Sequence, residues 1–168
     1  MNPVIEQFAA DCHDILKKDR GAAGRELVRQ RLETVLTDES VIKDYFGPDD
    51  NSARNVLYED PEFGFCIIAH VYKDARVRNP HDHGESWAIY GQVEGTTEMT
   101  EFRLLEKPTE AQPGKAEPEK TYDLKPGMAV AYEPGKLHAP VRYGPTKLLR
   151  IEGINLQNVK RDKYEKVA

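Results

Sequence analysis

Residues 75–95 read ARVRNPHDHGESWAIYGQVEG and place His81 and His83 two positions apart, just before the β-rich run 87–93. Side chains at i and i+2 of a strand point to the same face, so both imidazoles can approach one point. His138 follows in the stretch 127–140, GMAVAYEPGKLHAP. Three imidazoles on neighbouring strands can hold one face of a metal ion and leave other positions open for a substrate. The alternative is that each histidine is an ordinary surface or core residue.

The chain from residue 55 onward is rich in β-forming residues. Runs of this kind, separated by turn residues, occupy 63–72, 87–93, 98–105, 128–132 and 148–154. No strongly helical stretch lies between them, which disfavours a parallel βαβ sheet and favours an antiparallel sandwich or barrel. Segment 106–120 carries three prolines, one glycine and seven charged residues, so it is predicted to be a solvated loop.

The first fifty residues have helical periodicity instead. Apolar residues recur at three- and four-residue spacing from Val4 to Leu16 and from Leu27 to Leu36, and a shorter apolar run ends at Phe46. We expect two or three helices packed on the barrel within 1–50, the barrel within 51–157, and a charged surface tail within 158–168. All three parts belong to one domain.

Composition excludes several function classes. The chain has 168 residues, of which 24 are Lys or Arg and 29 are Asp or Glu, giving a net charge of −5. This balance disfavours nucleic-acid partners. There is no apolar run of roughly 18 residues and no signal-like N-terminal segment, so we expect a soluble, cytoplasmic protein without a membrane partner. The two cysteines, Cys12 and Cys66, lack CxxC spacing and are predicted to be reduced, packed thiols.

The first histidine stretch resembles the first motif of the cupin superfamily, in which a glycine precedes an HxH pair, a glutamate and a closing glycine. Here His81 and His83 supply the pair and Gly95 closes the motif. Two positions depart from the pattern, since Ala75 stands for the leading glycine and Ala88 for the glutamate.

The second stretch resembles the second cupin motif, in which a glycine precedes a PxG turn and a histidine. Gly127, Gly135 and His138 match it, with Glu133 in place of the proline. The resemblance covers residues 75–142. It implies an antiparallel double-stranded β-helix, the cupin jelly-roll barrel, with a metal ion held by the three histidines.

Loss of the motif glutamate bears on the chemistry. Three neutral imidazoles leave the charge of a divalent ion uncompensated, which favours an anionic, chelating substrate such as a thiolate. The chain resembles the thiol dioxygenases, the cysteine and mercaptopropionate dioxygenases, which hold ferrous iron with three histidines and oxidise a thiol to a sulfinic acid. That likeness extends to the pair Arg54-Asn55. It implies Fe(II) as cofactor, O2 and a small thiol carboxylate as substrates, and Arg54 as the residue that binds the substrate carboxylate.

Other positions depart from those dioxygenases. Their Ser-x-His-x-Tyr run corresponds to LLRIE at 148–152, and their crosslinked cysteine corresponds to Ala88. Tyr90 shares strand parity with Ala88, so it is our candidate for the catalytic hydroxyl beside the metal; the alternative is an ordinary barrel-lining aromatic. Arg54 is alternatively a solvated surface residue. Arg150 and Glu152 share a parity, and they either line the cavity as an ion pair or face solvent.

Two further function classes stay open at this stage. The first is a cupin that binds or senses a small ligand without turnover, because a fold does not fix a function. The second is a cupin lyase or isomerase that uses Zn, Mn or Ni. The expected partner of the dioxygenase-like enzyme is a small anionic substrate, and a homodimer through edge strands is the default assembly.

Overall fold

The computed structural model describes residues 1–167 and contains three helices followed by ten strands in that part of the chain. The helices are α1 (Pro3–Lys18), α2 (Ala22–Glu33) and α3 (Glu39–Tyr45). The strands are β1 (Asn55–Glu59), β2 (Cys66–Tyr72), β3 (Arg76–Val77), β4 (Ala88–Glu94), β5 (Thr97–Glu106), β6 (Gly114–Leu124), β7 (Ala129–Tyr132), β8 (His138–Arg142), β9 (Thr146–Glu152) and β10 (Tyr164–Lys166).

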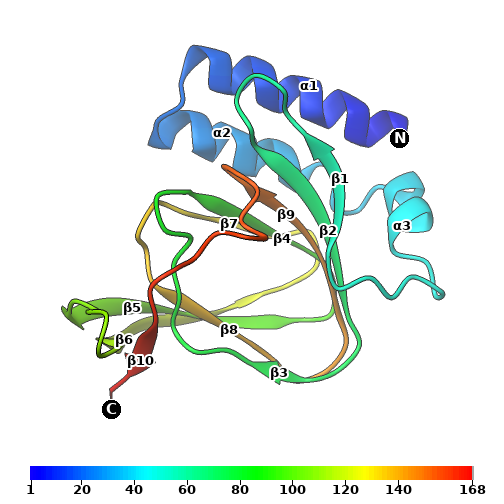
Figure 1. Ribbon diagram of the computed structural model, residues 1–168. Helices are drawn as coiled ribbons and strands as arrows, with labels where there is room; N and C mark the ends of the chain where they lie inside the picture. The colour runs from blue at the N-terminus through cyan, green and yellow to red at the C-terminus, as the bar shows by residue number, and fades with distance from the viewer. Residues whose placement is uncertain (168) are drawn as a thin grey trace.

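Two five-stranded sheets form the barrel. Their strand orders are β1-β2-β9-β4-β7 and β10-β6-β5-β8-β3. Strands β1 to β9 pair with one another in antiparallel fashion. Within the described chain, β10 is the one strand that pairs in parallel, and its partner is β6. Figure 1 shows α1 and α2 lying across the first sheet, on the side away from the second sheet. The predicted antiparallel double-stranded β-helix with N-terminal helices is confirmed.

The main hydrophobic core lies between the helices and the first sheet. Alternation along the strands separates two faces of that sheet. The face toward the helices is aliphatic and packs against helical side chains such as Phe8 and Leu32; it presents Ile67, Ala69, Ile89, Leu149 and Ile151. The opposite parity presents polar side chains to the barrel interior, among them His70, Tyr90, Arg150 and Glu152. The apolar face therefore stabilises the fold, and the polar side chains of the barrel interior are the candidates for a functional site.

Segment 106–120 corrects a prediction. It was expected to be a solvated loop, but residues from Gly114 onward belong to β6, and only 107–113 lie between strands. Composition misled here because the outward face of β6 is exposed and charged while Ala116 and Leu124 are buried. Pro118 lies beside a register shift between Glu101 and Phe102, where a strand accommodates a residue without an N–H donor.

The C-terminal tail is more ordered than a surface extension. Residues 164–166 form β10, in which Tyr164 pairs with Gly114 of β6. Arg161 Nη1 donates to the carbonyl of Asp82 at 3.1 Å, and the Tyr164 hydroxyl donates to an Asp82 carboxylate oxygen at 3.3 Å. The tail therefore contacts the first histidine motif.

The motif glycines occupy backbone conformations that other residues rarely adopt. Gly95, Gly127 and Gly135 have φ values of 75°, 88° and 78°. A Cβ atom on Gly95 would also lie 2.4 Å from the carbonyl oxygen of Pro145. These positions set the turns that bring the two motifs together, which gives a physical reason for the glycines in the pattern.

Other sequence-based expectations concern the thiols and membrane association. Cys12 and Cys66 are both free and buried, as predicted, and burial raises the pKa of the Cys66 thiol to about 11. Within residues 1–167, none of the helices combines the length and apolar character needed to span a bilayer.

Asn2 joins the start of α1 to α3. Its Oδ1 accepts from the backbone N–H groups of Val4 and Ile5, and its Nδ2 donates to Asp44 at 2.7 Å. Asn2→Ala is expected to lower the free energy of unfolding by about 1–2 kcal/mol, because a buried cap is lost. Urea denaturation measures this, with Asn2→Ser as a variant that keeps a capping oxygen and adds no carboxylate beside Asp44. Equal stability of the wild type and Asn2→Ala would contradict the role of this cap.

Candidate metal centre

Three histidines from the two motifs lie together at one end of the barrel interior. One ring nitrogen of each of His81, His83 and His138 lies within 4.8 Å of those of the other two. The backbones of His81 and His138 exchange two N–H to carbonyl hydrogen bonds, both of 2.9 Å. This bridge joins the two motifs directly and fixes the rings beside one another.

The expected strand geometry of the HxH pair is only partly present. His81 forms an isolated bridge, and His83 lies in the irregular segment that precedes the turn at Gly84. Asp82 faces away from the cluster, toward the Gly84 N–H and Tyr164. Glu85 is exposed to solvent. The cluster among residues 1–167 therefore consists of imidazoles without a carboxylate.

Hydrogen bonds and burial set the tautomer and the protonation state of the imidazoles. His138 Nδ1 donates to the carbonyl of Lys136 at 2.9 Å, and His81 Nδ1 donates to the carbonyl of Asn79 at 3.1 Å. Because a carbonyl only accepts, each ring carries its lone pair on Nε2. Burial lowers the pKa of His81 to about 4 and holds the pKa of His83 and of His138 well below the usual range. All three rings are neutral near pH 7, the form that binds a metal ion.

Tyr90 of β4 lies within the same cluster. Its hydroxyl is 2.8 Å from His83 Nε2 and 3.1 Å from His138 Nε2. The Tyr90 side chain is fully buried, and burial raises the pKa of its hydroxyl. The structure therefore places the predicted hydroxyl in contact with two of the three predicted ligands.

A cavity of about 190 Å³ adjoins the histidines. Six of the residues that line it are arginines, namely Arg54, Arg76, Arg78, Arg142, Arg150 and Arg161. His70, His81 and His83 line it too, and none of the lining residues described in 1–167 is acidic. The cavity is therefore strongly cationic, and a small anion is the ligand that its charge favours.

Arg150 and Glu152 face the barrel interior and pair with each other there. The Glu152 carboxylate is only 2% exposed and contacts Arg54 Nη1 and Nη2 at 3.3 and 3.0 Å. Arg150 Nη1 lies 3.5 Å from the same carboxylate, and the Arg150 guanidinium covers the Tyr90 ring at 4.4 Å. Arg54 is partly exposed, and Glu152 and Asn155 already engage its Nη atoms.

Most of the residues that line this cavity were not among the predicted site residues, and Arg142 and His70 are the two buried polar or charged ones. Arg142 was missed although a signal existed, because it lies four positions after His138 on β8 and so shares its strand face. His70 lies in the predicted β-rich run 63–72, and a single histidine in a strand gives no motif that would mark it as a site residue. The structure shows it lining the cavity, with Nδ1 2.6 Å from the carbonyl oxygen of Ala53.

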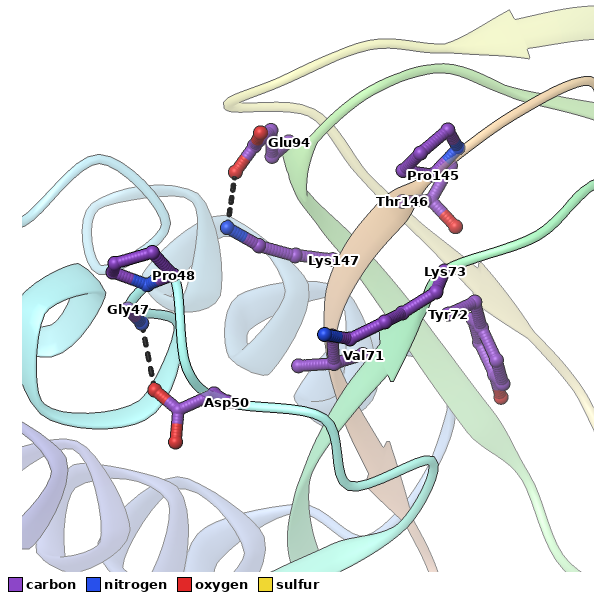
Figure 2. A pocket seen from close by; sticks show the side chains of 10 residues that line it. All are labelled: Gly47, Pro48, Asp50, Val71, Tyr72, Lys73, Glu94, Pro145, Thr146 and Lys147. Atoms are coloured by element: carbon purple, nitrogen blue, oxygen red, sulfur yellow. Dashed lines mark hydrogen bonds and ion pairs between the residues drawn. The ribbon is translucent and has the colours of Figure 1, made fainter.

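A second cavity, of about 280 Å³, lies outside the barrel between the α3–β1 connection and the ends of β2 and β9 (Figure 2). Its charged groups are largely engaged: Lys147 pairs with Glu94 at 2.7 Å, and Asp50 accepts from the Gly47 N–H at 2.7 Å. Figure 2 shows no histidine or cysteine among the lining side chains. The histidine cavity is accordingly the candidate functional site.

Comparison with known proteins gives structural matches only, since no family model and no curated protein matches the chain. The chain is similar to a cupin superfamily protein from Desulfitobacterium hafniense, with 18% identity over 61% of this chain and 76% of that chain and a TM-score of 0.45. It is also similar to KdgF from Halomonas sp., with 19% identity over 59% of this chain and 74% of that chain and a TM-score of 0.43. A protein from Bacillus halodurans matches with 12% identity over 70% of this chain and 81% of that chain and a TM-score of 0.50.

At such identities the likeness concerns the fold and not the activity. The protein folds as a jelly-roll barrel of two antiparallel sheets behind three N-terminal helices, and within residues 1–167 it carries a cluster of three histidines able to bind a metal ion.

Proposed function

We propose that the protein is a mononuclear iron enzyme of the thiol dioxygenase type, acting on a small anionic thiol. The observation that carries the proposal is the three-histidine cluster directly beside an arginine-lined cavity. Neutral imidazoles do not offset the charge of a divalent ion, and the arginines attract an anion. A thiolate that also bears a carboxylate satisfies both parts of the site.

The donor set fits ferrous iron. His81, His83 and His138 would hold the ion, because imidazole nitrogen suits iron as well as zinc, manganese or nickel. When bound, iron would supply open coordination positions at which a thiolate and O2 meet.

The remaining roles fall to side chains of the barrel interior. Tyr90, in contact with two ligand rings, would hold a proton beside the reacting sulfur and orient the substrate. Arg54 would bind the substrate carboxylate, either through Nε, which has no hydrogen-bond partner within residues 1–167, or in exchange for Glu152.

The proposed reaction balances without a further oxidant or reductant. A thiol and O2 give a sulfinic acid, R–SH + O2 → R–SO2H. Both oxygen atoms form bonds to sulfur, and the electrons that sulfur loses reduce O2. The thiol proton leaves sulfur and ends on the sulfinic group or in solvent.

Oxygen uptake tests the proposal. Iron-loaded protein is expected to consume O2 with cysteine or mercaptopropionate and to form one sulfinate for each O2. Cysteamine, which lacks a carboxylate, is expected to react more slowly. An oxygen electrode and mass spectrometry with labelled O2 measure both quantities, and zinc-loaded protein is the control.

Two results would replace this proposal with another. Turnover without O2 in protein loaded with zinc, manganese or nickel would indicate a lyase or isomerase. Tight binding of an anion without any turnover would indicate a binding or sensing cupin.

Tyr90→Phe removes only the hydroxyl that contacts the ligand rings. We expect kcat for O2 uptake to fall by about 10- to 100-fold while iron content stays unchanged, because the ligands are retained. Tyr58→Phe is the matched control, since the Tyr58 hydroxyl bonds Asp60 near the helices. Equal kcat values in Tyr90→Phe and wild type would argue against a role for this hydroxyl.

A further inference from the structure

The charge of the histidine cavity exceeds what the protein itself neutralises. Within residues 1–167, Glu152 is the one carboxylate that pairs with arginines of the cavity, and it pairs with Arg54 and Arg150 but not with Arg142. The guanidinium charges of Arg54, Arg142 and Arg150 thus exceed the carboxylate charge by two, and the other three lining arginines add to this excess. The three neutral imidazoles do not change this balance.

Arg142 carries the least compensated of these charges. It is 2% exposed, makes no ion pair within residues 1–167, and contacts the Tyr72 ring, with its guanidinium carbon 4.5 Å from the ring centroid. Burial lowers the pKa of Arg142 to about 10, which still leaves it charged at neutral pH. Its Nε and Nη2 atoms are buried and have no hydrogen-bond partner in the described chain. Isolating a charge in this way is costly unless an anion binds it.

His70 adds a second requirement on the ligand. Its Nδ1 donates to the carbonyl of Ala53, so the lone pair lies on Nε2. Nε2 is buried and has no hydrogen-bond partner within residues 1–167, although His70 lines the cavity. A ligand that satisfies this atom brings an O–H or N–H donor.

We propose that this cavity binds a small organic dianion with oxyanion groups and a hydroxyl or amino donor, held by Arg142 and Arg150. The guanidinium fork matches a carboxylate or a phosphate, and both chemistries supply the two missing negative charges. Arg54, whose Nη atoms contact Glu152 and Asn155, would contribute to the same anion through Nε, as in the proposed function. This inference rests on the proposed function, in which the substrate is an anion. It specifies further that this anion carries two negative charges.

Calorimetric titration of chelator-treated, metal-free protein tests the inference. The probes are malate and glycerol phosphate, two hydroxylated dianions, and lactate, a hydroxylated monoanion. Malate or glycerol phosphate is expected to bind at least about tenfold more tightly than lactate, and the tighter one identifies the oxyanion class. Arg142→Gln and Arg150→Gln are each expected to weaken dianion binding by about tenfold or more. Arg103→Gln, at an exposed arginine of β5, is the matched control.

A stability measurement separates binding from a structural role. Without an anion, Arg142→Gln is expected to unfold at a higher temperature than wild type, because an uncompensated buried charge is removed. Loss of dianion binding together with a raised Tm supports the proposal. Lactate binding as tightly as both dianions, or dianion binding unchanged in both arginine variants, would overturn it, as would no dianion binding at all. Because metal-free protein is used, failure of the oxygen-uptake test leaves this result intact.

Discussion

His138→Ala is expected to abolish metal retention. Wild-type protein purified with iron should hold about one ion per chain, and the variant less than about a tenth of that, because removing one of three protein ligands leaves too few donors. The variant is expected to fold, since the bridge between residues 81 and 138 is made by backbone atoms. Metal analysis after dialysis against a weak chelator measures the loss.

His13→Ala is the control for that experiment. His13 lies on α1, where its Nδ1 is 2.9 Å from Asp60 and its ring stacks on Phe63. Its removal changes the outer layer of the molecule and not the barrel interior. Equal metal content in His138→Ala and His13→Ala would count against the three-histidine site.

The sequence predicted the architecture because each layer has its own periodicity. Helical spacing before residue 50 and short β-rich runs after residue 55 correspond to α1–α3 and to the barrel strands. Five of the described strands, β1, β3, β6, β8 and β10, lie outside the predicted runs, and the longest of them, β6, differs from the predicted strands because its outward residues face water along most of its length. A polar, proline-containing stretch has the composition of a loop, and its pairing with β5 on one side and β10 on the other makes it a strand.

The predicted histidines could be found from the sequence because their spacing belongs to two short motifs. The charge of the cavity could not, because parity shows which residues share a face but not which side of a sheet is covered. Arg150 and Glu152 lie inside the barrel since the helices cover the opposite face of the first sheet with aliphatic contacts. The register that sets Arg150 beside Tyr90 and Ile68 comes from strand pairing far apart in the chain. Such long-range pairing is not visible in a single run of residues.

Glu152→Gln is expected to destabilise the protein by about 3–5 kcal/mol, since it removes the one carboxylate shared by two buried or partly buried arginines while keeping side-chain volume. Urea denaturation of metal-free protein measures the change in unfolding free energy. Glu94→Gln is the matched control: Glu94 pairs with Lys147 at the surface, and the loss there should stay below about 1 kcal/mol. Equal losses of unfolding free energy in the two variants would show that the Glu152 carboxylate stabilises the protein no more than a surface carboxylate does.

The same variant connects stability to binding. In Glu152→Gln the excess positive charge of the cavity rises by one, so a bound dianion offsets more repulsion than it does in wild type. A ligand that binds only the folded state stabilises it in proportion to its affinity and concentration. Malate or glycerol phosphate should therefore restore more unfolding free energy to Glu152→Gln than it adds to wild type, and sodium chloride at equal ionic strength should not. A rescue of the same size by chloride would mean that general screening, and not a built site for a dianion, balances these arginines.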